Sequence, residues 1–189
     1  MKKILLLTFV IISTFIFCQD KMFYTNNKQV VWENIFKTDK SIQEIKSILN
    51  SSGKIKFNGE TENSLTGEIN DFVMDYKGAG YTLMGTPNYL NQSNKFYATF
   101  KLDTKEGRYR VVITNIRSKG NKLSLFTGGS GLGMGLSDSG ENNIEDFVLK
   151  NDRETFRGGF TGRESKIIDH SFTNLFDVSK YQNISNDNW

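Results

Sequence analysis

The spacing of apolar and polar positions changes from strand-like to helical within the first third of the chain. Residues 28–37, KQVVWENIFK, are rich in β-branched and aromatic side chains and predict a first strand. Helical spacing follows, with apolar residues on one face at Ile42, Ile45, Ile48 and Leu49. Ser41 and Glu44 have the spacing of a capping box, and Gly53 is placed to end the helix.

A strict alternation predicts a hairpin over residues 95–113. Its inward positions are apolar: Phe96, Ala98, Phe100, Leu102, Tyr109, Val111 and Ile113. A four-residue loop of residues 104–107 pairs Phe100 with Val111 and keeps both apolar rows on one face. A loop one residue longer or shorter would place Arg110 among the phenylalanines.

This register also makes a prediction about the outer face of the hairpin. It places Lys101 opposite Arg110. Like charges in that arrangement disfavour a strand pair by up to about 1 kcal/mol unless an anion or an acidic side chain lies between them.

The remaining pattern predicts the fold class. Residues 54–58 and 65–76 form another hairpin, residues 78–92 are irregular, and residues 121–126 indicate one more strand. Helical spacing returns over residues 164–180. We therefore expect an α+β fold, in which an antiparallel sheet of five or six strands carries one helix after the first strand and a C-terminal helix packed on it.

Residues 1–18 have the pattern of a secretory signal peptide. Two lysines precede an uncharged run that ends at Cys18. The run is shorter than the about 20 apolar residues that cross a bilayer, so cleavage before Gln19 is preferred to an uncleaved anchor. The other alternative is a lipid-modified Cys18, which the bulky Phe17 in front of it disfavours.

The rest of the chain is expected to form one domain over residues 19–180, followed by a disordered polar tail over residues 181–189. Without residues 1–18 it has no cysteine, which excludes disulfides and thiolate metal sites. The formal charge of +3 includes two signal lysines and falls to +1 without them, so nucleic acid is not the expected partner. We expect an exported protein, periplasmic, associated with the outer envelope or secreted, without a transmembrane span after cleavage.

Three runs carry a resemblance to a known family: VVWENIF, SIQEIKSIL and YATFKLDTKEGRYRVVITNI. With the export signal, they make the chain resemble an uncharacterised domain-of-unknown-function family of exported bacterial envelope proteins with a fold like the TATA-binding protein. The resemblance spans residues 28–117 and rests on element order and hydrophobic pattern. It implies a fold and no activity, and a shared fold does not transfer DNA binding.

Residues 125–140, LFTGGSGLGMGLSDSG, have glycine at every second position through their middle. The spacing fits neither a P-loop nor a dinucleotide fingerprint. We expect a mobile surface loop or lid here. The alternatives are an anion site and an apolar segment, with Leu132, Met134 and Leu136 on one side, that orders on a partner or a lipid.

The residues that could support catalysis are few. His170 is the only histidine, which leaves little room for a His-based triad or a zinc site, and we expect it on the surface. Several carboxylates gather in and beside one predicted hairpin: Glu60, Glu62, Glu68, Asp71 and Asp75. Paired carboxylates could hydrolyse a glycoside, but a half-exposed sheet carries such acids without catalysis. The sequence predicts no metal and no cofactor.

The outer face of the 95–113 hairpin is the candidate binding site. Its residues are Lys95, Tyr97, Lys101, Arg108 and Arg110. Cations around an aromatic ring suit phosphate, carboxylate or an acidic protein surface. The alternative is a solvated face balanced by acids such as Glu68 or Asp71.

We therefore expect a non-catalytic exported binding or interaction module, not an enzyme, with an unknown protein or small-molecule partner in the cell envelope. One alternative is a carrier of an apolar small molecule, held in a cavity between the sheet and residues 164–180. A carboxylate-based hydrolase is less favoured, and it requires two acids that converge in a cleft.

Overall fold

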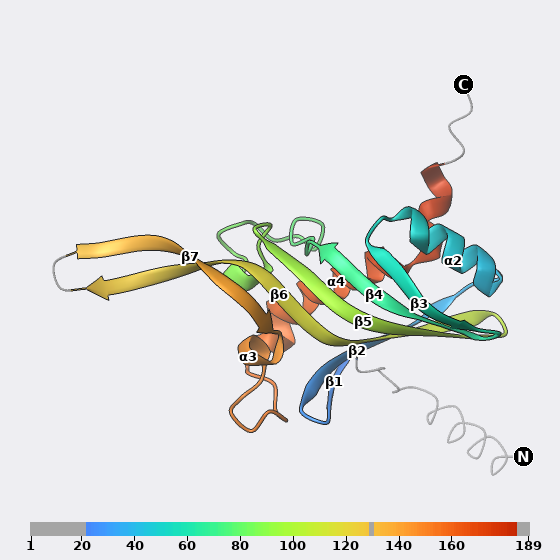
Figure 1. The fold of residues 1–189 in the computed structure, drawn as a ribbon, viewed down its shortest axis with the longest axis horizontal. Helices are drawn as coiled ribbons and strands as arrows, with labels where there is room; N and C mark the ends of the chain where they lie inside the picture. The colour runs from blue at the N-terminus through green and yellow to red at the C-terminus, as the bar shows by residue number, and fades with distance from the viewer. Residues whose placement is uncertain (1–21, 129–130, 185–189) are drawn as a thin grey trace, which may run out of the picture.

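A computed structural model describes residues 22–128 and 131–184 (Figure 1). Seven strands form one antiparallel sheet in the order β1-β2-β6-β5-β4-β3, and β7 pairs with β6 off this path. The strands are β1 (Phe23–Asn26), β2 (Gln29–Lys37), β3 (Ile55–Thr61), β4 (Ser64–Phe72), β5 (Asn94–Lys105), β6 (Arg108–Gly128) and β7 (Gly131–Asn143). The helices are α2 (Ile42–Ser51), α3 (Glu145–Val148) and α4 (Ser165–Phe176), with helical turns η2 (Asn88–Leu90), η3 (Phe160–Glu164) and η4 (Val178–Ile184).

This arrangement confirms the predicted α+β class, with one helix after the early strands and one near the C-terminus. The sheet is larger than the five or six strands expected. Strand β1 was not predicted, and it joins β2 through a turn in which Asn27 and Lys28 both have positive φ, 49° and 64°. Two positive φ values are the geometry of the type I′ turn, which matches the natural twist of a hairpin.

The helix α2 follows its sequence prediction at both ends. The Ser41 side chain accepts a hydrogen bond from the Glu44 amide, and the Glu44 carboxylate accepts one from the Ser41 amide at 2.8 Å. Gly53, just beyond the helix, has φ 64°, a conformation that glycine adopts without strain. Ile45 and Leu49 are buried against the core, as their spacing predicts.

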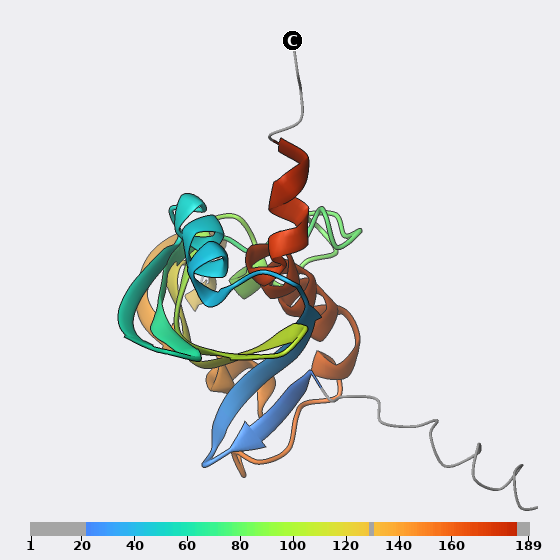
Figure 2. The same cartoon turned by 90° about the vertical axis from the view of Figure 1, so that its right-hand side faces the viewer.

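The core lies between one face of the sheet and the helices α2 and α4, which stand on the same side of it (Figure 2). The buried side chains of α4 are Ile167, Ile168, Ser171, Phe172, Leu175 and Phe176. Aromatic rings join the two layers, because Trp32 lies 5.5 Å from Phe172 and Phe100 lies 5.2 Å from Phe176 between ring centroids. Among the described residues, no helix covers the opposite face of the sheet.

The β5–β6 hairpin has the predicted faces but not the predicted register. Its turn is only Glu106 and Gly107, so Phe100 pairs with Ile113 instead of Val111. Gly107 has φ 71°, a left-handed conformation that favours glycine and permits the shorter turn. The register moves by two residues, and an even shift keeps every side chain on its own face.

Two of the register shifts in the sheet preserve the alternation along β4, β5 and β6. The β4–β5 register shifts between Ile69 and Phe72, where Asp71 has φ 49°. The β5–β6 register shifts opposite Ala98, where Asn115 has φ 52°. An extra residue at each point returns the following apolar side chains to the core. The bulge at Asp71 also directs its side chain away from the core.

The described parts of the glycine segment, residues 125–128 and 131–140, lie in strands and not in a loop, which corrects our prediction. Residues 131–140 lie in β7, which pairs with the second half of β6 in a register that joins Leu125 to Met134. The predicted strand 121–126 is confirmed as part of β6, and β2 pairs with the first half of the same strand. The β6–β7 hairpin projects from the rest of the molecule (Figure 1). Glycine favours a loop only by its backbone freedom, and pairing with a neighbouring strand outweighs that preference.

Other expectations fall partly outside the described residues. The predicted signal peptide, including Cys18, lies outside them, as do residues 185–189 of the predicted tail. The first residues of that tail, 181–184, belong to η4. Within the described ranges, no helix combines the length and apolar character that a membrane span requires.

Candidate functional site

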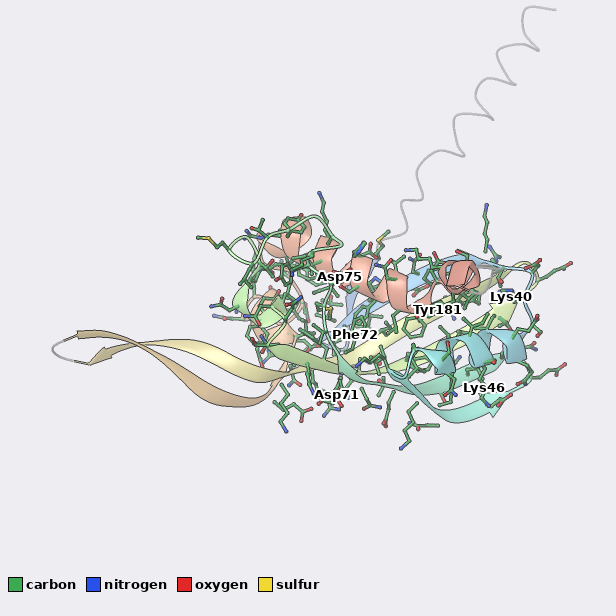
Figure 3. The ribbon with its side chains drawn as sticks, turned by 90° about the horizontal axis from the view of Figure 1, so that it is seen from above. Lys40, Lys46, Asp71, Phe72, Asp75 and Tyr181 are labelled. Carbon is green, nitrogen blue, oxygen red and sulfur yellow. The ribbon has the colours of Figure 1, made fainter. Side chains whose placement is uncertain are left out.

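The outer face of the sheet is the side away from α2 and α4. Many charged side chains of the strands lie on this face. Its cations are Lys37, Lys56, Lys95, Lys101, Lys105, Arg108, Arg110, Arg117 and Lys119. Its acids are Glu33, Glu68, Asp71, Asp103 and Glu141. Figure 3 shows how adjacent residues divide between the faces, since Phe72 points toward α4 and Asp71 points away from it. Among the side chains that the structure describes, cations outnumber acids on this face, while the whole chain has a formal net charge of +3.

Two residues of the predicted site share one acidic partner. The Tyr97 hydroxyl donates to Asp71 Oδ1 at 2.8 Å, and Lys95 Nζ lies 3.2 Å from the same oxygen. Hydrogen bonds from Tyr97 and Lys95 hold the pKa of the Asp71 carboxyl below its usual range. The same contact with Asp71 raises the pKa of Tyr97. This end of the patch is therefore charge-compensated.

Lys101 and Arg110 share a different acid. They are not opposite each other as predicted, and the acidic side chain that the sequence analysis allowed for between them is Asp103. Asp103 lies directly opposite Arg110, with 3.1 Å between Arg110 Nη2 and Asp103 Oδ2, and Lys101 Nζ lies 2.9 Å from Asp103 Oδ1. Arg110 also lies 3.7 Å from Glu33 on β2. The shorter turn causes the difference, because it moves Asp103 into the position that the predicted register gave to Lys101.

These contacts set the ionisation of the pair. Partial burial raises the pKa of Asp103, but hydrogen bonds from Lys101, Arg110 and Ser64 outweigh it and leave the pKa below its usual range. The hydrogen bond to Asp103 raises the pKa of Arg110. Asp103 and Arg110 are therefore both charged, and each is neutralised by its partner on the outer face.

Arg108 differs from the other predicted residues. It pairs across the sheet with Lys37 of β2 on one side and Lys105 of β5 on the other. We call these three residues the cation row. Within the described part of the chain, no carboxylate lies within 4.0 Å of a charged nitrogen of the cation row.

A hollow of about 220 Å³ opens beside the cation row. It is lined by Glu33, Ile35, Asp103, Lys105, Arg108 and Arg110. Ile35 supplies an apolar wall and is 44 % exposed, which is unusual for a large aliphatic side chain in a strand. A second, more open hollow of about 500 Å³ adjoins it along Asp103 and Arg110, and threonines of β4, β5 and β6 line much of that hollow.

The residues of the predicted site therefore fall into two kinds. Lys95, Tyr97, Lys101 and Arg110 contact acidic side chains, whereas Arg108 does not. Sequence reasoning missed Lys37 and Lys105, the two neighbours of Arg108. The predicted four-residue loop included Lys105, so the prediction did not place Lys105 in a strand beside Arg108. The signal that could have found it is Gly107, since glycine supplies the positive φ that several tight turns require at their third position.

The predicted carboxylates do not converge. Glu60 pairs with Lys46 of α2, Asp71 faces outward, and Asp75 lies 3.5 Å from His170 Nε2. The side chain of His170 is 33 % exposed, so it lies at the surface as expected, and Asn174 Nδ2 lies 2.8 Å from the same nitrogen. Among the described residues, no group of three or more His, Cys, Asp or Glu side chains could hold a metal ion.

Buried side chains occupy the region between the sheet and α4, where the carrier hypothesis requires a cavity. The largest of them include Trp32, Tyr109, Phe96, Phe172 and Phe176. They belong to one continuous core cluster.

Two solved structures are similar to this chain. One is a DUF4468 family protein from Bacteroides ovatus, which is 11 % identical with a TM-score of 0.48, and the match covers 86 % of this chain and 91 % of that one. The other is a TBP-like protein from Parabacteroides distasonis, which is 11 % identical with a TM-score of 0.41, and the match covers 82 % of this chain and 96 % of that one. Their descriptions agree with the resemblance expected from the sequence, to an uncharacterised family with a TBP-like fold. No family model matches the chain, and no curated protein matches it.

Proposed function

We propose that this protein is a non-catalytic binding module that holds a negatively charged protein or small molecule against the outer face of its sheet. One observation carries the proposal: the cation row has no acidic partner among the described residues, whereas the neighbouring Arg110 and Lys101 do. Unrelieved like charges weaken a sheet. A bound anion removes that cost, and so the arrangement favours a surface that is completed by a partner.

The signal-peptide pattern of residues 1–18 supports export, which would place the partner in the periplasm, at the outer envelope or outside the cell. The small net charge expected after cleavage supports a partner other than nucleic acid. Neither a carrier nor a hydrolase gains support, because aromatic side chains fill the sheet–helix interface and the predicted carboxylates lie apart.

A comparison of three immobilised proteins tests this proposal. Wild type, Lys105→Gln/Arg108→Gln and a control, Lys77→Gln/Lys166→Gln, are each incubated with an envelope extract, and the bound proteins and small molecules are identified by mass spectrometry. The control changes the net charge equally at two exposed residues outside the outer face. We expect an acidic molecule that wild type and the control retain and the outer-face variant loses. Equal retention by all three, or recovery of the molecule in chemically altered form, would contradict the proposal.

A further inference from the structure

We propose that the cation row and the hollow beside it form a binding site for a phosphate monoester, with the phosphate on the cation row and the ester portion against Ile35. This inference rests on the proposed function and names the ligand class of the same face. It follows from the spacing of the cations, the size of the hollow and the state of the neighbouring acids.

The spacing suits one compact anion. Adjacent strands lie about 4.8 Å apart, so the α-carbons of Lys37, Arg108 and Lys105 span about 10 Å, and all three side chains can reach one group above Arg108. The planar guanidinium of Arg108 can contact two phosphate oxygens together, and the lysines act as flexible point charges on either side. A phosphate monoester carries nearly two negative charges at pH 7, which matches several cations better than a single carboxylate does.

The neighbouring charges leave the cation row available. Asp103 is occupied by Lys101 and Arg110, and Glu33 accepts a hydrogen bond from the Tyr24 hydroxyl at 2.9 Å. Glu106, in the turn next to the cation row, is exposed, and no ion pair of it occurs among the described residues.

The backbone holds the cation row in place. Lys37 and Arg108 are paired residues of β2 and β6, and just beyond them the Thr38 amide donates to the Gly107 carbonyl oxygen at 3.1 Å. The site therefore stands on strand ends fixed on both sides. A preorganised site of this kind loses less conformational entropy on binding than one on a free loop.

The volume of the hollow limits the size of the ester portion of the ligand. Its volume of about 220 Å³ is below the range of about 300–1,000 Å³ typical of pockets for drug-sized molecules. It can hold a phosphate and a short neighbouring segment. The exposed Ile35 side chain offers that segment an apolar contact. A phosphate monoester of this kind could be soluble or could belong to a lipid headgroup, and the two sources share the chemistry that the site would recognise.

Isothermal titration calorimetry with glycerol phosphate at constant ionic strength tests the inference. We expect wild type to bind and Arg108→Gln to bind at least about tenfold more weakly. The affinity of Arg108→Lys should lie between the two, because lysine keeps the charge but cannot make the two-point contact of a guanidinium. Lys77→Gln, a surface control elsewhere on the molecule, should match wild type. Circular dichroism of each variant shows whether it is folded.

Flotation with vesicles forms the second arm, in which phosphatidylcholine vesicles with phosphatidic acid are compared with phosphatidylcholine alone. Binding to glycerol phosphate that depends on Arg108 assigns a soluble source, and binding only to phosphatidic acid that depends on Arg108 assigns a lipid source. Wild type that binds neither probe, or binding that Arg108→Gln leaves unchanged, overturns the inference. If an acidic peptide binds the cation row while both phosphate probes fail, the phosphate inference falls and the proposed function stands.

Discussion

At the scale of single residues, Tyr109 shows how one side chain fastens α4 to the sheet. Its ring is stacked on Phe36, and its buried hydroxyl donates to the Phe176 carbonyl oxygen at 2.6 Å and accepts from the Val178 amide at 3.1 Å. Burial raises the pKa of this hydroxyl, which keeps it protonated and able to donate.

Tyr109→Phe tests this contact. The substitution leaves two buried backbone groups without their partner, so we expect it to lower the free energy of unfolding by about 1–3 kcal/mol. Urea unfolding followed by circular dichroism measures the change. Tyr97→Phe is the control, because its hydroxyl contacts an exposed carboxylate, and it should change stability by no more than about 0.5 kcal/mol. Similar values for the two variants would argue against the assigned role.

The capping box of α2 gives a second residue-scale prediction. Ser41→Ala removes the acceptor for the Glu44 amide and should lower the free energy of unfolding by about 1 kcal/mol. Ser47→Ala, an exposed position inside the same helix, should leave stability unchanged or raise it slightly, because alanine has the higher helix propensity. The same unfolding measurement distinguishes them. A loss at residue 47 as large as that at residue 41 would contradict the assignment.

The capping box could be predicted because its signal lies within four consecutive residues. The left-handed backbone at Asp71 and Asn115 could not, since nothing local requires it there. Each bulge is set by the need to return the next apolar residues to the core, and that need arises only when neighbouring strands are in place.

At the scale of elements, the β5–β6 hairpin separates what alternation determines from what it leaves open. Alternation fixed which side chains face inward, and the structure confirms that face for Phe100, Val111 and Ile113. It did not fix the pairs, because loops of two and four residues satisfy the same alternation. The site depends on the pairs, and so the predicted repulsion fell on Lys101 and Arg110 instead of on Arg108 and its neighbours.

Two arginines on the same face of β6 test the register. Arg108→Gln relieves repulsion with Lys37 and Lys105, and it should raise the free energy of unfolding by up to about 1 kcal/mol at low salt, with a smaller gain at high salt. Arg110→Gln removes contacts with Asp103 and Glu33, and it should lower that free energy by up to about 1 kcal/mol. Urea unfolding at two salt concentrations measures both. The opposite pattern of signs would support the four-residue loop.

The depressed pKa of Asp103 predicts a pH effect. A carboxyl whose pKa is lower in the folded than in the unfolded state stabilises the fold above its usual pKa and loses that contribution as the pH falls through the folded value. Asp103→Asn should therefore be less stable than wild type at pH 7, and the difference should shrink below about pH 4. Urea unfolding at pH 7 and at pH 3 checks this. A difference independent of pH would show that the carboxylate charge is not involved.

At the scale of the whole molecule, the two faces of the sheet have different partners. The inner face is covered by α2 and α4, and its side chains form the continuous core. The outer face carries an excess of cations and two adjoining hollows. The sequence predicted this division, because one amphipathic pattern runs through the strands and another through the helices. It did not predict the extension of the sheet by β7, since glycine-rich runs have no strong strand signal.

We propose the cation row as the part of the outer face that binds an anion. A nitrogen–proton correlation spectrum recorded during a titration with inorganic phosphate, at constant ionic strength, tests it most directly. We expect saturable shifts that are largest for amides of residues 35–38 and 105–110. Shifts centred on Lys95 and Tyr97, on α4 or on residues 78–92, or no saturable shift at all, would contradict it.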